Sequence, residues 1–125
     1  MKIKGRFDHF NINVTDLDKS IWFYETALGL HETHRKEASD GSFVLVYMAD
    51  DHGSFLLELT WLRDHVQSYE LGENESHLCL RVEGDYDEVR RFHQEMGCVC
   101  FENSAMGLYF IHDPDDYWIE ILPVK

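Results

Sequence analysis

The stretch HFNINVTDLDKSIWFYETALGL, residues 9–30, decides the fold of this chain. Its opening residues alternate as in a strand: Phe10, Ile12 and Val14 fall on one side, and polar residues fall on the other. The alternation predicts a strand with one buried face. It places His9, which opens the strand, on the opposite and polar face.

A helix follows this strand directly. We expect Thr15 to cap its N-terminus, with Asp18 in a variant of the capping box, and Gly29 to end it. Apolar residues recur along it at helical spacing, at Leu17, Ile21, Tyr24 and Leu28. The chain therefore begins with a strand joined to an amphipathic helix.

The second half of the chain repeats this pattern. The residues that follow His77 alternate like those that follow His9, and Asp85 stands where it can cap a second helix. Gly97 lies as far beyond His77 as Gly29 lies beyond His9. An internal repeat with this agreement indicates a duplicated module.

Each half then closes with two more strands separated by an acidic turn. These strands are expected at residues 43–48 and 55–61 in the first half, and at 107–112 and 117–122 in the second. Residues 62–74, between the halves, predict a short helix followed by a polar loop. The pattern predicts an α+β fold with mixed or antiparallel sheets and the helices on the outside.

Four residues at equivalent places in the two halves predict a metal site: His9, Glu58, His77 and Glu120. Taken singly, a histidine at a strand start is usually a surface residue, and a strand glutamate can point to solvent. Together they fall on the same predicted face of a repeat, and imidazoles with carboxylates are ligands for a divalent metal ion. From the alternation we also expect this face to line a concave cavity and the apolar face to be covered by the helices.

The remaining histidines have plainer explanations in solvation, packing or a hydrogen bond to the acidic turn. They are His31, His34, His52, His65, His93 and His112. Cys98 and Cys100 could be a metal pair, but alternation along a strand explains them better. Trp22 and Trp61 are expected in the core.

The composition limits the classes of function. At 125 residues the chain is expected to be one domain, and its formal net charge of −13 excludes a basic face for nucleic acid. No apolar run is long enough to span a bilayer. Three cysteines without the spacing of a disulfide framework predict reduced thiols and a cytoplasmic location.

The chain resembles the vicinal oxygen chelate superfamily, and within it the bacterial glyoxalase I (lactoylglutathione lyase) family. The resemblance covers nearly the whole chain and is carried by His9, His77 and four short segments. These segments are VTDLDKSIWFYETALGL (14–30), ELTW (58–61), YELG (69–72) and DPDDYWIEI (113–121). It implies one glyoxalase-like domain of two βαβββ modules, at about 5–62 and 75–125, with curved mixed sheets enclosing a cavity and helices outside.

The resemblance also implies an activity. In a homodimer, His9 and Glu58 of one protomer would meet His77 and Glu120 of the partner subunit around one divalent metal ion, with nickel or cobalt favoured and zinc possible. The implied reaction isomerises the hemithioacetal of methylglyoxal and a thiol to a thioester, which detoxifies methylglyoxal. Glu120 would act as the base, and Glu58 would serve the opposite enantiomer.

The chain departs from the family pattern where the thiol binds. Asn13 stands where the family commonly has an arginine, Leu62 where it has an asparagine, and residues 102–106 lack the usual lysine and glycines. Arg81 lies four residues after His77, so it either anchors a substrate carboxylate or pairs with an acid such as Glu83. The candidate substrate-binding residues are Arg81, Asn13, Asn11, Thr60 and Trp118. The thiol therefore stays open between glutathione and another small thiol.

Two other functions remain as alternatives. One is a different metalloenzyme of the superfamily, such as an epimerase or a thiol transferase; an extradiol dioxygenase fits less well, because it usually has three protein ligands. The other is a metal-free protein that binds a drug or signal in an aromatic cleft. Stoichiometric metal binding would separate these two classes.

Overall fold

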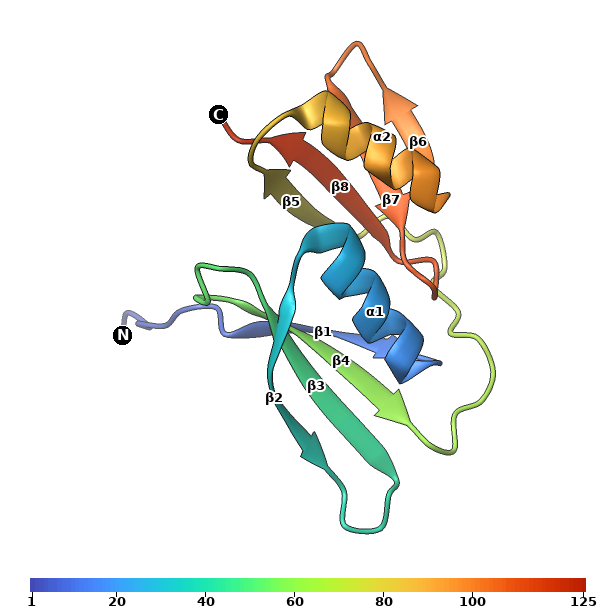
Figure 1. Cartoon of the computed structure of the whole chain (residues 1–125). Helices are drawn as coiled ribbons and strands as arrows, with labels where there is room; N and C mark the ends of the chain where they lie inside the picture. Colours follow the sequence, from blue (N-terminus) through green and yellow to red (C-terminus); the bar gives the residue numbers. More distant parts are fainter. The chain divides into compact units, whose positions relative to one another are not determined.

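The computed structural model describes residues 1–125, and the chain forms two compact units, Met1–Tyr69 and Glu70–Lys125. Each unit contains one four-stranded sheet and one helix, in the order βαβββ along the chain (Figure 1). The units repeat the same topology with different sequences, as the internal repeat predicts.

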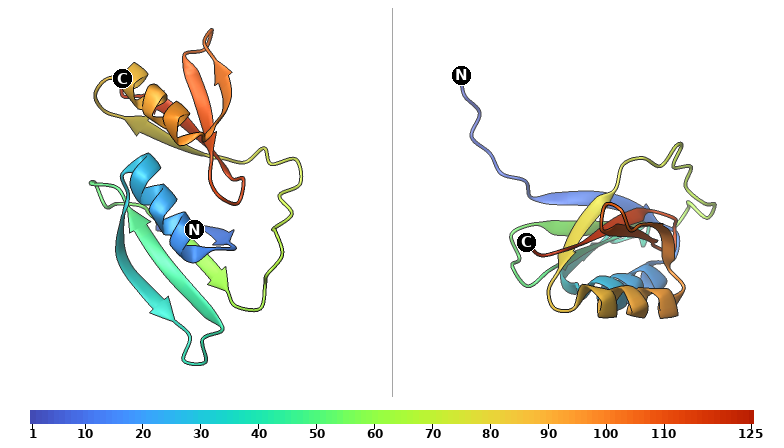
Figure 2. Two further views of the ribbon diagram at one scale, coloured as in Figure 1. Left: turned by 45° about the vertical axis from the view of Figure 1, so that its right-hand side comes forward. Right: turned by 90° about the horizontal axis from the view of Figure 1, so that it is seen from above.

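In the first unit, β1 pairs in parallel with β4, and β4, β3 and β2 are antiparallel neighbours. The elements are β1 (His9–Val14), α1 (Leu17–Leu28), β2 (His31–Glu37), β3 (Phe43–Ala49) and β4 (Leu56–Leu62). Helix α1 lies across one face of this sheet (Figure 2). The opposite face of the sheet is not covered by any helix of its own unit.

The second unit has the equivalent arrangement, with β5 parallel to β8 and with β8, β7 and β6 antiparallel. Its elements are β5 (Leu78–Val82), α2 (Tyr86–Met96), β6 (Val99–Asn103), β7 (Leu108–His112) and β8 (Trp118–Pro123). The fold is therefore the βαβββ fold of two mixed sheets, as the sequence and the resemblance predict.

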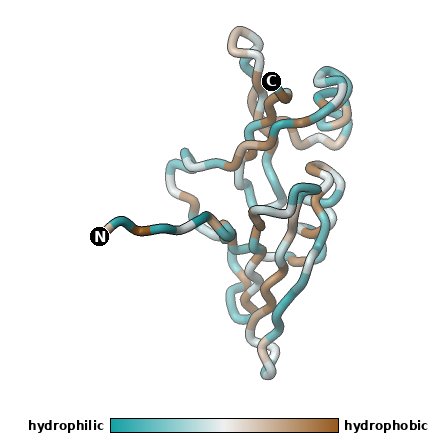
Figure 3. Tube along the Cα trace, turned by 90° about the vertical axis from the view of Figure 1, so that its left-hand side faces the viewer, coloured by the Kyte–Doolittle hydropathy of each residue, from teal (hydrophilic) through white to brown (hydrophobic).

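The core of the first unit lies between α1 and the sheet. Ile12 and Val14 of β1 and Leu57 and Leu59 of β4 are buried there, and Tyr24 from α1 is fully buried against them. Phe10, which shares the strand parity of Ile12, is 47% exposed and is not part of this core. Hydrophobic and hydrophilic stretches of the chain are distinguished by colour in Figure 3, and the alternation is regular in β1. Burial of the apolar face stabilises the unit and leaves the other face free for polar side chains.

The helix ends follow the sequence with one correction. Asp16, not Thr15, caps α1, because its Oδ1 accepts a hydrogen bond from the Lys19 amide at 3.1 Å. Asp85 caps α2 in the same way, and left-handed glycines end both helices. Threonine and aspartate are both good N-cap residues, so the local backbone conformation decides whether Thr15 or Asp16 caps the helix.

Three other expectations are wrong. Residues 62–74 contain turns but no helix, and Val66, which would have anchored such a helix, is 85% exposed. A short helix without a packed face is too weak to form. Strand β2 has no apolar alternation that would mark it in the sequence. It lies at the edge of the sheet and all its side chains are exposed, so its residues can all be polar. Trp22 is 59% exposed and does not pack in the core.

None of the helices combines the length and the apolar character that crossing a bilayer would require.

Candidate metal and active site

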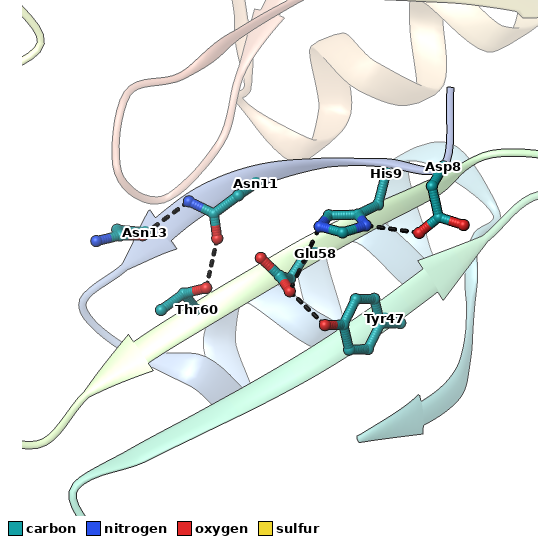
Figure 4. A network of polar contacts seen from close by, with 7 residues as sticks. All are labelled: Asp8, His9, Asn11, Asn13, Tyr47, Glu58 and Thr60. Atoms are coloured by element: carbon teal, nitrogen blue, oxygen red, sulfur yellow. Dashed lines mark hydrogen bonds and ion pairs between the residues drawn. The ribbon is translucent and has the colours of Figure 1, made fainter. Parts of the chain in front are cut away.

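The first candidate pair, His9 and Glu58, lies on the face of the sheet away from α1. The parallel register of β1 and β4 places Asn11 beside Glu58, so His9, two residues earlier, shares the same face. The His9 Nε2 atom is 3.8 Å from Glu58 Oε2 (Figure 4). Neighbouring parallel strands thus bring together two residues that are far apart in the sequence.

The second pair, His77 and Glu120, has the same construction. Cys79 of β5 stands beside Glu120 of β8 in the parallel register, and His77 lies two residues before Cys79. The His77 Nε2 atom is 3.2 Å from Glu120 Oε1. The internal repeat therefore holds at the level of side-chain geometry as well as of strands.

Both imidazoles are oriented by an oxygen acceptor on their other nitrogen. His9 Nδ1 donates to the Asp8 carboxylate at 2.7 Å, and His77 Nδ1 donates to the backbone carbonyl of Glu75 at 3.0 Å. The hydrogen bond that His9 donates to Asp8 raises the pKa of the His9 imidazole. When Nδ1 carries the single proton of a neutral ring, Nε2 presents a lone pair, as a metal ligand must.

This geometry is a test of whether the residues fit a metal ion. With the proton on Nδ1, each Nε2 is an acceptor near a carboxylate oxygen, at 3.8 Å for His9 and 3.2 Å for His77, so a shared proton or metal ion would satisfy both groups. A divalent ion satisfies both groups, and its preferred ligands are these donor types. The four residues His9, Glu58, His77 and Glu120 fit a metal as two pairs.

Each half supplies only two donors. No group of three or more possible metal ligands is clustered anywhere in the chain. The structure brings His9 to Glu58 and His77 to Glu120, and the joining of the two pairs around one ion stays a prediction.

Tyr47 is a residue of the candidate site that the sequence reasoning missed. It stands opposite Glu58 in the antiparallel register of β3 and β4, and its hydroxyl donates a hydrogen bond to Glu58 Oε2 (Figure 4). This hydrogen bond, together with burial, raises the pKa of Tyr47 to about 12. Tyr47 falls on the same strand face as Glu58, so the register of the strands, had it been known, would have revealed it.

A row of polar side chains continues along the same face beyond Glu58. The Thr60 hydroxyl donates to Asn11 Oδ1, and Asn11 Nδ2 donates to Asn13 Oδ1 at 2.9 Å (Figure 4). Three of the candidate substrate-binding residues therefore form one hydrogen-bonded ladder, in which Asn11, the neighbour of Glu58 in the strand register, joins Thr60 to Asn13. The ladder is neutral and offers hydrogen bonds, not charge.

Arg81 fulfils neither simple expectation. Its Nη1 donates to the backbone carbonyl of Pro123 at 2.8 Å, and it makes no ion pair with Glu83 or with any other acid. A guanidinium has five N–H donors, so most of them remain available. The pairing with Glu83 is therefore wrong, and the anchoring role stays a prediction.

Trp118 belongs to an aromatic cluster beside Glu120. The centroid of its ring lies 5.4 Å from that of Phe110 and 6.4 Å from that of Phe101. Phe110 in turn meets the His77 ring edge-on, with the two centroids 4.9 Å apart. Phe101 is 47% exposed. The second unit thus presents an aromatic surface next to its histidine–carboxylate pair.

Comparison with known proteins identifies the family. Residues 6–121 match the family model described as the glyoxalase/bleomycin resistance protein/dioxygenase superfamily. The lactoylglutathione lyase of Neisseria meningitidis is 32% identical over 127 residues, covering 96% of this chain and 91% of its own. The chain belongs to the glyoxalase I family of this superfamily.

Other glyoxalase I relatives agree. A probable lactoylglutathione lyase of Synechocystis is 32% identical and is aligned over 91% of this chain and 92% of its own. The trypanothione-dependent glyoxalase I of Leishmania major superposes with a TM-score of 0.83 at 31% identity, covering 96% of this chain and 87% of that one. Glyoxalase I of Zea mays, at 22% identity, shares the fold with a TM-score of 0.81, over 95% of this chain and 44% of that one.

Membership of the glyoxalase I family supports a lyase-type enzyme with a divalent metal ion. The two histidine–carboxylate pairs found here have the ligand chemistry that such an ion requires.

Proposed function

We propose that the chain is a metal-dependent glyoxalase I-like lyase, which converts the hemithioacetal of methylglyoxal and a thiol into a 2-hydroxyacyl thioester. One observation carries this proposal: the two repeat-related pairs, in each of which an oriented imidazole presents Nε2 to a carboxylate. Its relatives named lactoylglutathione lyase support the same reaction class. The activity fits detoxification of methylglyoxal in a reducing, cytoplasmic setting.

In this proposal, His9 and Glu58 bind the metal ion together with His77 and Glu120. A protein site for such an ion normally needs three or four ligands, and each pair supplies only two. Two protomers complete it in a homodimer, where the first pair of one chain meets the second pair of the other. Nickel or cobalt is the favoured ion and zinc is possible.

A divalent ion held by these residues would supply electrophilic stabilisation of the negative charge that develops on the substrate. Glu120 removes the proton from the carbon that bears the sulfur, and the proton is returned to the adjacent carbonyl carbon. The hydroxyl-bearing carbon becomes the thioester carbonyl as its O–H proton passes to the former ketone oxygen, which becomes the 2-hydroxy group, so the reaction is an isomerisation. Glu58 performs the same transfer for the opposite enantiomer.

The other candidate residues bind the substrate. The ladder of Asn11, Asn13 and Thr60 gives neutral hydrogen bonds beside Glu58, and Trp118 gives an apolar surface beside Glu120. Arg81 anchors a carboxylate of the thiol through donors that the Pro123 carbonyl leaves available. Relatives named for glutathione and for trypanothione are both similar to this chain. The activity assay should therefore compare glutathione with other small thiols as the co-substrate.

The test is thioester formation by apoprotein that is reloaded in parallel with nickel, cobalt or zinc. Wild-type protein should turn over only when metal is bound, and Glu120→Gln should lose at least about a hundredfold in kcat while keeping most of its metal, since a general base contributes about 10²–10⁴. Glu95→Gln, on the exposed face of α2, is the matched control. Full activity in Glu120→Gln would exclude Glu120 as the base, and absence of metal binding would exclude the proposal.

A further inference from the structure

The two halves differ at one position beside their carboxylates. In the antiparallel register, Tyr47 of β3 stands opposite Glu58, and Phe110 of β7 stands opposite Glu120. The two rings occupy equivalent places in the repeat and differ by a single hydroxyl group. That hydroxyl makes the surroundings of the two carboxylates chemically unequal.

In the first half, the carboxylate is held from two sides. The Tyr47 hydroxyl donates to Oε2 of Glu58, which is also the oxygen that faces His9 Nε2 at 3.8 Å. The Glu58 side chain is only 12% exposed, so little water competes for this hydrogen bond. A buried carboxylate that accepts a phenol hydrogen bond loses rotational freedom and keeps its other oxygen directed outward.

The Tyr47 ring is itself fixed. His34 stacks on it with ring centroids 4.4 Å apart and planes at 10°, and His9 meets it edge-on at 5.6 Å. Thr33 Oγ1 contacts both His34 Nδ1, at 2.8 Å, and the Tyr47 carbonyl, at 3.3 Å. Contacts with His9 and His34 thus hold the Tyr47 ring so that its hydroxyl points to Glu58 before any ligand binds.

In the second half, the corresponding ring repeats the packing but not the hydrogen bond. Phe110 meets His77 edge-on at 4.9 Å, as Tyr47 meets His9. Glu120 faces His77 Nε2, and its neighbour in the register is Cys79, whose thiol is a weak donor. Glu120 is therefore contacted by His77 at 3.2 Å but has no counterpart of the Tyr47 hydroxyl that Glu58 accepts from.

We propose that Tyr47 is a positioning residue that fixes Glu58 as a static metal ligand, and that Phe110 leaves Glu120 free to rotate between the metal and the substrate carbon. This inference rests on the proposed function, and it deepens it by giving the two carboxylates different roles. A base must change its contacts during the reaction, whereas a ligand that only holds the ion works best when it is rigid.

The first part of the test is the affinity of the apoprotein for Ni²⁺ or Co²⁺ alone, measured by competition with a chromogenic chelator. Tyr47→Phe keeps the ring and its stacking on His34 but removes the hydroxyl, and it should weaken binding about 10–100-fold, as is usual for groups that orient a ligand. The matched control is Tyr86→Phe, which removes a phenol hydrogen bond of the second half, from α2 to the Ile121 backbone carbonyl, leaves Tyr47 and the His9–Glu58 pair intact, and should leave the affinity unchanged. Wild-type affinity in Tyr47→Phe would overturn the positioning role.

The second part adds the missing hydroxyl to the other half. Phe110→Tyr should lower kcat about tenfold or more without weakening the binding of the metal ion, because Glu120 would now be held in place as a ligand. An unchanged kcat in Phe110→Tyr would overturn the division of roles. If the wild-type protein itself binds no metal, the proposed function fails and this inference fails with it; if the wild type binds metal and turns over, an unaffected variant removes only the inference.

Discussion

At the scale of single residues, the candidate site depends on groups that orient other groups. His9 and His77 both use Nδ1 to donate to an oxygen, and both present Nε2 to a carboxylate. The acceptors differ, since one is the Asp8 side chain and the other is the Glu75 backbone. This difference makes one histidine sensitive to mutation of its acceptor and the other insensitive.

Asp8→Asn is expected to weaken metal binding about tenfold, because the amide no longer favours the same tautomer of His9 and gives a weaker hydrogen bond. Binding of Co²⁺ or Ni²⁺ to the apoprotein, measured by chelator competition, checks this prediction. Glu75→Ala is the control: its side chain does not hold His77, because the backbone carbonyl does. An equal loss in both variants would show that the effect is one of surface charge.

At the scale of the elements, strand register decides which side chains meet. The parallel pairing of β1 with β4 and of β5 with β8 places each histidine two residues before the neighbour of its glutamate. Helices α1 and α2 cover the other face of their sheets, and their starts are fixed by Asp16 and Asp85. The cap of α1 also fixes where β1 ends, at Val14, and so supports the strand that carries His9.

Asp16→Ala should lower the free energy of unfolding by about 1 kcal/mol, because the first-turn amide of Lys19 loses its acceptor. Asp16→Asn should be nearly neutral, since asparagine caps helices as well as aspartate does. Urea denaturation of the two variants and the wild type measures the difference. A loss in Asp16→Asn as large as that in Asp16→Ala would show that the charge of Asp16, and not its capping, matters.

At the scale of the whole molecule, the chain is a tandem repeat in which each unit holds an incomplete ligand set. A strongly acidic chain, with a formal net charge of −13, repels anions at long range, so an anionic substrate needs local positive groups such as a metal ion or Arg81. Under the proposed function, completion of the ligand set by a second protomer is the property on which activity would depend.

A mixing experiment tests how the site is completed. His9→Ala and His77→Ala should each be inactive alone, and subunits mixed by unfolding and refolding together should recover about a quarter of the wild-type activity. Half of the dimers formed at random are mixed, and in each of these one of two sites has all its ligands when the sites join two chains. No recovery, with dimers detected by light scattering, would indicate sites formed within one chain.

The sequence by itself determined the repeat, the glycine ends of the helices, the mixed sheets and the four candidate ligands, because alternation, helical spacing and turn residues are local signals. It misplaced the cap of α1, predicted a helix in residues 62–74 and put Trp22 in the core. Those features depend on which faces become covered, which the local pattern does not contain.

Only the tertiary structure decided that Tyr47 reaches Glu58 and that Arg81 binds the Pro123 carbonyl instead of Glu83. The first contact joins the consecutive antiparallel strands β3 and β4, and the second joins β5 to β8, and both are set by the pairing of the strands. The sequence fixes which chemical groups are available, whereas the pairing of strands selects the groups that act together.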